Sequence, residues 1–138
     1  MLKSQQYSKI VFDHVQDIAK NEEKNKDKDL NARKYKSLCK RAGGIFRTIG
    51  LIQFLTFIAA KGRKYEHYRF LSEHLQKELH DIGLVRSAPG QDFLNELQQL
   101  DLPNFMRVSQ SVLKLLLWHK RIGEILIEGD ADDPDDKD

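Results

Sequence analysis

The chain has 138 residues, of which 40% are hydrophobic and 32% are charged, a composition that fits one soluble domain with its own core. No apolar run is long enough to span a bilayer, and the first residues lack the apolar segment of a secretion signal, so we expect a cytoplasmic protein. The single cysteine, Cys39, excludes an internal disulfide and a multi-cysteine metal site.

Charge is distributed unevenly along the chain. The net charge is +2, but residues 128–138 carry seven acidic side chains and one lysine, so the preceding 127 residues carry a net charge of +8. A basic body favours a polyanionic partner. The acidic segment has no large apolar side chain to bury. The sequence therefore predicts a folded domain over residues 1–128 and a disordered acidic tail over residues 129–138.

The apolar period is helical nearly everywhere, which predicts an all-α protein. A first helix is expected over residues 3–20, followed by a solvated loop over residues 21–29, which has no apolar side chain. The next helix, over residues 30–49, has an apolar face opposite a basic one. Two glycines, Gly43 and Gly44, lie on the basic side, where they either bend the helix or leave this face bare for close approach.

The remaining elements are also helical. Residues 51–60 are apolar on nearly all sides, which predicts a helix at the centre of a bundle. Further helices are expected over residues 64–82, 92–100 and 103–127. The predicted architecture is a single antiparallel bundle of five or six helices around the central apolar helix.

No group of residues has the spacing that catalysis or metal binding needs. The five histidines include no pair at i, i+4, and His67 and His74, which share a face, have no obvious third ligand. Cys39 and His119 are expected to be packed core residues. A nucleophile elbow, a Walker-type glycine loop and a zincin motif are all missing, so we expect a protein that is not an enzyme and takes no cofactor and no metal.

Two rows of Lys and Arg are the most informative feature of the sequence. They occupy one face of the helix at residues 30–49 and one face of the helix at residues 103–127. In the second row, steps of about 10–11 Å would let cations follow a phosphate backbone without reading its sequence. An ordinary solvated helix face is the alternative. The candidate nucleic-acid contacts are Arg33, Lys36, Lys40, Arg41, Arg47, Arg107, Lys114 and Arg121.

Large apolar side chains also fall outside the buried stripe of the last helix. Exposed groups of this kind often mark a contact with another protein. The alternative is that another helix of the bundle covers them. The candidate protein-interface residues are Leu113, Leu117 and Trp118.

Three segments resemble one known family. Residues 50–62 contain a Gly-Leu pair, an apolar run with phenylalanines and a closing lysine, and residues 111–121 contain a tryptophan followed by a basic pair. Residues 35–49 fit the helix before the Gly-Leu pair. In this order and spacing the segments are similar to the small subunit of the type III-B CRISPR effector, the Cmr complex. Two departures are a Phe-Met pair where the family often has a tyrosine, and the paired glycines of the basic helix.

The resemblance implies a non-catalytic, all-α subunit of an antiviral complex that targets RNA. The implied partners are copies of the subunit itself, the backbone subunit, and the guide RNA and target RNA; RNA cleavage is the backbone subunit's work. The resemblance implies no membrane and no small-molecule substrate. A helical protein–protein adaptor without nucleic-acid contact is the alternative, and salt-sensitive RNA binding separates the two.

Overall fold

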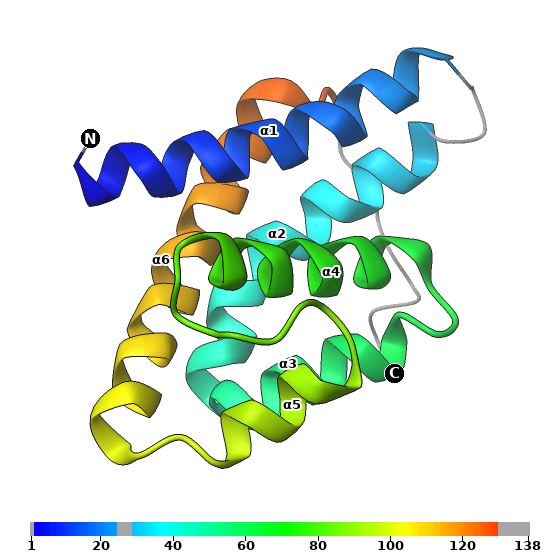
Figure 1. Cartoon of the computed structure of the whole chain (residues 1–138). Helices are drawn as coiled ribbons and strands as arrows, with labels where there is room; N and C mark the ends of the chain where they lie inside the picture. Colours follow the sequence, from blue (N-terminus) through cyan, green and yellow to red (C-terminus); the bar gives the residue numbers. More distant parts are fainter. Residues whose placement is uncertain (1, 25–28, 130–138) are drawn as a thin grey trace.

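The computed structural model describes residues 2–24 and 29–129, and in these ranges it contains helices and no strand. The helices are α1 (Lys3–Lys24), α2 (Asp29–Ile49), α3 (Leu51–Lys61), α4 (Glu66–Asp81), α5 (Gln91–Gln98) and α6 (Leu102–Leu126). They pack into one bundle, in which α1 lies across α6 and α3 lies beside α5 (Figure 1). None of these helices is long and apolar enough to cross a membrane. The predicted all-α bundle is confirmed.

The polar segment after the first apolar stripe is more helical than predicted. α1 continues to Lys24 and α2 begins at Asp29, so the loop predicted over residues 21–29 is wrong at both ends. Residues 25–28 lie outside the described ranges. The segment is rich in Glu and Lys, which are good helix formers, and a helix that is packed along most of its length can continue through a polar end.

The centre of the bundle is formed by α2 and α4. α2 contacts α1, α3, α4 and α6, and α4 contacts α1, α2, α3 and α6. Tyr35 of α2 and Tyr68 of α4 are among the largest fully buried side chains. The apolar stripes predicted for α2, α4 and α6 supply much of the core, including Leu38, Ala42, Leu71, Leu75, Leu79, Val108, Val112, Leu115 and Leu116.

The prediction that residues 51–60 form the central helix is wrong. α3 packs against α4, α2 and α5 with one side, which buries Leu51, Phe54, Leu55 and Ile58. Its other side is open to solvent at Gln53, Thr56 and Ala60. The exposed positions of α3 are polar or small, and the large side chains of Ile52 and Phe57 are only partly buried, so a mostly apolar helix can still lie at the margin of the bundle.

Two glycines determine how α3 joins its neighbours. Gly50 has a φ of 83°, in the left-handed region that disfavours side chains, and its N–H donates to the Phe46 carbonyl at 2.8 Å. At Gly62, an added Cβ would lie 2.9 Å from Cα of Arg69, so the turn approaches α4 more closely than a side chain would allow. α2 ends at Ile49 and α3 ends at Lys61, each directly before one of these glycines.

Candidate nucleic-acid interface

A cavity of about 600 Å³ lies between the start of α1, one face of α6 and the segment that follows α4. Its walls carry three cationic side chains, Lys3, Arg107 and Lys114, and two aromatic side chains, Tyr7 and Trp118. The other lining residues are polar or apolar, and none is acidic. Cations beside aromatic rings are typical of surfaces that bind single-stranded nucleic acid. We call this feature the α1–α6 cavity.

α6 is held in place by its N-terminal cap and by its contact with α1. The Asp101 carboxylate accepts a hydrogen bond from the N–H of Asn104 at 3.1 Å, and Pro103 occupies the first turn. Further along, the hydroxyl groups of Tyr7 and Ser111 form a hydrogen bond of 3.0 Å that joins α1 to α6. These contacts fix the register of the two helices that build the cavity.

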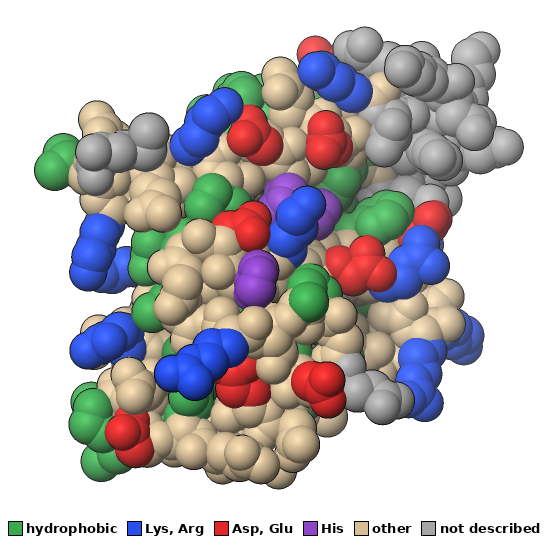
Figure 2. Space-filling model, viewed as in Figure 1, with side chains coloured by type: hydrophobic (Ala, Val, Ile, Leu, Met, Phe, Trp, Pro, Cys, Tyr) green, Lys and Arg blue, Asp and Glu red, His purple; other side chains and the backbone are tan. Residues whose placement is uncertain are grey.

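The basic row predicted on α6 is exposed. Arg107, Lys114 and Arg121 all lie on the surface, and the first two line the α1–α6 cavity whereas Arg121 does not. Figure 2 shows Lys and Arg side chains along the edge formed by the start of α1 and by α6. Tertiary packing thus brings Lys3, which the sequence analysis did not select, next to two predicted residues.

The basic row predicted on α2 is only partly on the surface. Arg33, Lys40 and Arg47 are exposed, and we call these three residues the α2 basic face. Arg41 is half-buried, and its Nε donates to the carbonyl of Ser37 at 3.2 Å. The face therefore has fewer exposed cations than the sequence predicted.

Lys36 does not share the exposed face with Arg33 and Lys40, and the prediction is wrong on this point. Only 9% of Lys36 is exposed, and its Nζ donates to the carbonyl of Gly129 at 3.0 Å. Its Cγ lies 3.9 Å from the place where a Cβ on Gly123 of α6 would stand. Gly123 has no side chain, so it leaves room for the stem of Lys36 between the two helices. Lys36 therefore joins α2 to the end of α6.

α2 runs without interruption through Gly43 and Gly44. An added Cβ at either glycine would meet no atom within 4 Å, so both positions face open space. Of the two interpretations that the sequence left open, this geometry fits a bare helix surface that another molecule could approach closely.

The predicted protein-interface residues differ in exposure. Leu117 is exposed, whereas Leu113 and Trp118 are partly buried against the core. Two residues that the sequence analysis did not select, Leu102 and Met106 at the start of α6, are 69% and 51% exposed. The apolar surface therefore extends toward the beginning of α6.

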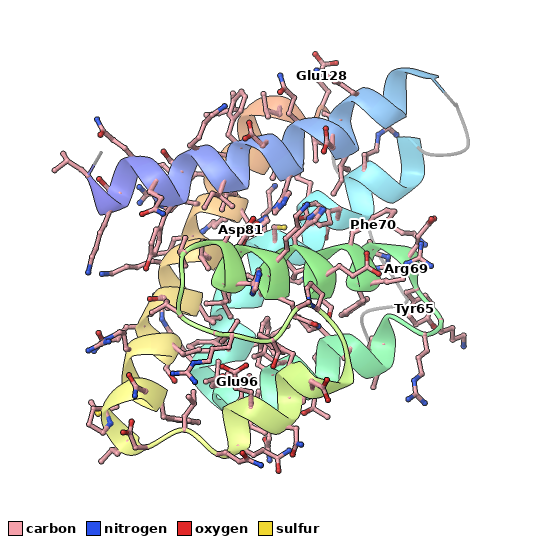
Figure 3. The ribbon with its side chains drawn as sticks, viewed as in Figure 1. Tyr65, Arg69, Phe70, Asp81, Glu96 and Glu128 are labelled. Atoms are coloured by element: carbon pink, nitrogen blue, oxygen red, sulfur yellow. The ribbon has the colours of Figure 1, made fainter. Side chains whose placement is uncertain are left out.

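A further cationic cluster, which the sequence analysis also missed, lies at the turn between α3 and α4. The ammonium groups of Lys61 and Lys64 lie 5.6 Å and 5.3 Å from the ring centre of Tyr65, and the guanidinium of Arg69 lies 5.5 Å from that of Phe70. Figure 3 shows Tyr65, Arg69 and Phe70 at the same end of α4. We call these residues the α3–α4 corner. A basic run directly followed by aromatic residues was the signal available in the sequence.

A buried network of polar side chains joins α1, α2, α4 and α6. Glu78 is fully buried, and its carboxylate bonds to Nδ1 of His14 at 2.6 Å and to Nε2 of His119 at 2.8 Å. The hydroxyl of Tyr35 bonds to Nδ1 of His74 and to Nδ1 of His119, each at 2.9 Å. A hydroxyl has one proton, so Tyr35 donates to one imidazole and accepts from the other. The predicted core position of His119 is confirmed.

Burial, charges and hydrogen bonds shift the pKa values of two members of this network, His74 and Glu78. Burial lowers the pKa of His74 to about 3, and the neighbouring His119 and His14 act in the same direction. Burial raises the pKa of Glu78, but the charges and hydrogen bonds of His119 and His14 outweigh it, so this pKa lies below its ordinary value. Burial also raises the pKa of the Cys39 thiol, which agrees with the predicted core role. In the described ranges, no three His, Cys, Asp or Glu side chains are arranged to hold a metal ion.

Fold and surface together define a small all-α protein that presents cations from two helices, α1 and α6, around an aromatic-lined cavity. The chain belongs to the family of CRISPR-associated proteins described as Cas_Cmr5, which matches residues 3–126, and the resemblance to the small subunit of the type III-B effector is confirmed. Its fold is similar to the X-ray crystal structure of a CRISPR-associated Cmr5 family protein from Thermus thermophilus. The TM-score is 0.70 at 24% sequence identity, covering 93% of this chain and all of that one. No curated protein matches the sequence.

Proposed function

We propose that the chain is a non-catalytic small subunit of a type III-B effector that is guided by RNA and targets RNA in antiviral defence. In this assembly several copies stack beside the backbone subunit, and their basic surfaces face the guide and target RNA. A subunit repeated along an RNA meets a different sequence at every position. Contacts to phosphate, which carry no sequence information, suit that task.

The α1–α6 cavity is the observation that carries this proposal. Lys3, Arg107 and Lys114 supply positive charge at its walls, and no lining carboxylate repels a phosphate. Tyr7 and Trp118 also line the cavity and are only partly covered by the core, so the open parts of their rings can stack on bases without sequence preference. The α2 basic face is the second candidate contact.

A non-catalytic role is supported by how the chain uses its acid–base groups. Glu78 and His119 are fully buried and bond to each other. A general acid or base must come within hydrogen-bond reach of its substrate. Groups that are paired inside the core do not meet this requirement, and RNA cleavage is left to another subunit.

Contacts with protein partners require apolar surface that the bundle leaves open. Leu102, Met106 and Leu117 supply such surface on α6, and Leu113 and Trp118 add the parts of their side chains that the core leaves uncovered. We infer that copies of the subunit, or the backbone subunit, bind on this side of α6.

Replacing Arg107 and Lys114 together with glutamine is expected to weaken RNA binding by the assembled complex. Each lost contact to single-stranded RNA should lower the slope of log K against log salt by about 0.7, so the pair should lower it by about 1.4. Fluorescence anisotropy over a salt series, with two RNAs of unrelated sequence, measures the slope. Affinity should fall by a similar factor for both RNAs, because phosphate contacts do not read bases.

Two matched double substitutions locate the interface. Lys40→Gln with Arg47→Gln tests the α2 basic face, and Lys61→Gln with Lys64→Gln tests the α3–α4 corner, which should leave the slope unchanged. Lys36 is unsuitable as a charge probe because it is buried. The proposed RNA interface is contradicted if the slope of log K against log salt changes neither in the Arg107/Lys114 variant nor in the Lys40/Arg47 variant. A helical protein–protein adaptor then becomes the better description.

A further inference from the structure

The chain leaves α6 in contact with the basic helix α2. Ile127 is buried, and its N–H donates to the carbonyl of Gly123 at 3.0 Å. Two residues later, Gly129 has a φ of 82°, and its carbonyl accepts from Nζ of Lys36 at 3.0 Å. The guanidinium of Arg33 approaches so closely that a Cβ on Gly129 would lie 2.9 Å from Nε. The last described residue is therefore bonded to Lys36 and lies beside Arg33, both on α2.

The charges on the two sides of this contact are complementary. Residues 130–138 contain six aspartates and one lysine, whereas residues 30–50 contain six Lys or Arg and no acidic residue. From this pairing and from the position of Gly129, we propose that residues 130–138 bind the α2 basic face of the same chain. The segment then acts as an internal polyanion that competes with other polyanions for this face.

The distances allow the segment to cover the whole face. Arg33 and Arg47 are fourteen residues apart on one helix, which corresponds to about 21 Å along its axis. Nine residues in extended conformation span up to about 30 Å. Gly129 lies at the Arg33 end of the face, so a segment that runs toward Arg47 can bring carboxylates beside Lys40 and Arg47 in turn.

The position of Gly129, directly before the acidic segment, favours α2 over the other basic surfaces as the binding site. The α6 row and the α3–α4 corner also carry cations, but Gly129 contacts neither in the described structure; it contacts Arg33 and Lys36. A short tether gives the carboxylates an effective concentration on the order of millimolar beside α2. Binding to the nearest face is therefore favoured over binding to an equally basic face further away.

Zero-length crosslinking with a carbodiimide tests the contact without any RNA. In the full-length protein at low salt, aspartates of residues 130–138 should be joined to Lys40 in preference to Lys64 and Lys114, as identified by peptide mass spectrometry. The yield should fall at high salt because the charges are screened. Equal yields at all three lysines, or none at Lys40, would overturn the proposal, whatever the outcome of the RNA experiments.

The anchor at Gly129 provides a matched pair of variants. Gly129→Ala introduces a side chain at a positive φ and against Arg33, and should reduce the crosslink to Lys40 severalfold. Gly83→Ala places alanine at a similar φ of 80° where nothing lies within 4 Å, so it introduces the same backbone strain away from α2. This control should keep the crosslink. Equal loss in both variants would show that the anchor has no role.

Competition is measured with a short poly-uridine RNA as the probe. Replacing all six aspartates of residues 130–138 with asparagine should raise the affinity of the free subunit by roughly three- to tenfold. The same replacement in a protein whose α2 basic face is changed to glutamine should have little effect, because the segment and the probe then have no shared site. An equal gain in both backgrounds would show general charge repulsion and contradict competition at α2.

Discussion

The Glu78→Ala variant is expected to be less stable than the unmodified protein by about 3–5 kcal/mol at pH 7. Glu78 is fully buried and accepts hydrogen bonds from His14 and His119, which come from two other helices. Its removal leaves buried imidazole groups without their carboxylate and opens a cavity where α1, α4 and α6 meet. Urea unfolding followed by circular dichroism measures the loss.

A control on the same helix separates this effect from a general effect of removing a carboxylate. Glu73 of α4 is exposed, so Glu73→Ala should change the free energy of unfolding by no more than about 0.5 kcal/mol. Similar small losses in both variants would mean that the buried network does not hold the helices together.

Stability is expected to fall as the pH drops below 6.5. His74 has a pKa of about 3 in the folded protein and an ordinary value of 6.5, so between these values the unfolded chain binds more protons and stability rises with pH. A pKa shift of this size corresponds to a change in the free energy of unfolding on the order of 5 kcal/mol. The pKa of Glu78 is also lowered, and its contribution is lost as the pH falls below the ordinary value of 4.5. Above pH 6.5 neither group adds a further change.

Unfolding free energies measured between pH 4.5 and 7.5 test this dependence, with His74→Phe as the matched variant. Phenylalanine preserves a ring next to His14, whose ring centre lies 4.5 Å from that of His74, but it does not titrate. The slope of stability against pH should be clearly flatter in the variant. An unchanged slope would assign the acid sensitivity to other groups.

The apolar period predicted the helices well because each stripe reports one buried face of one helix. Leu71, Leu75 and Leu79 are all fully buried on α4, as their spacing indicates. The apolar period does not predict where a helix lies in the bundle. Residues 51–60 are nearly all apolar, yet α3 has an open side, since composition does not say which neighbours cover which face.

The buried network contains one feature that the sequence predicts, the buried acid, and contacts that it does not predict. Glu78 follows Leu71 by seven residues and Leu75 by three, so a carboxylate inside the apolar stripe of α4 was a readable signal. Its partners His14 and His119 are 64 and 41 residues away on other helices, and no local spacing predicts that they meet it. A buried acid could be anticipated, but the identity of its partners could not.

The basic surfaces also combine residues that local spacing predicts with residues that only tertiary packing brings into place. The seven-residue spacing predicted that Arg107 and Lys114 share a face, and they line one cavity. Lys3 joins them only through the packing of α1 on α6. Lys36 has the spacing of the α2 row, but Gly123 on the facing helix admits its stem into the interior. Local spacing places a cation on a helix face, and tertiary packing decides whether that face is exposed.

Photochemical crosslinking in the effector complex tests the central claim most directly. The complex would be purified from its host through a tag on this chain, with its own guide RNA and a target RNA that contains 4-thiouridine. We predict crosslinked nucleotides on peptides that carry Tyr7 or Trp118, which line the α1–α6 cavity. Crosslinks to other subunits but none to this chain, or crosslinks to this chain confined to the α3–α4 corner, would contradict the account.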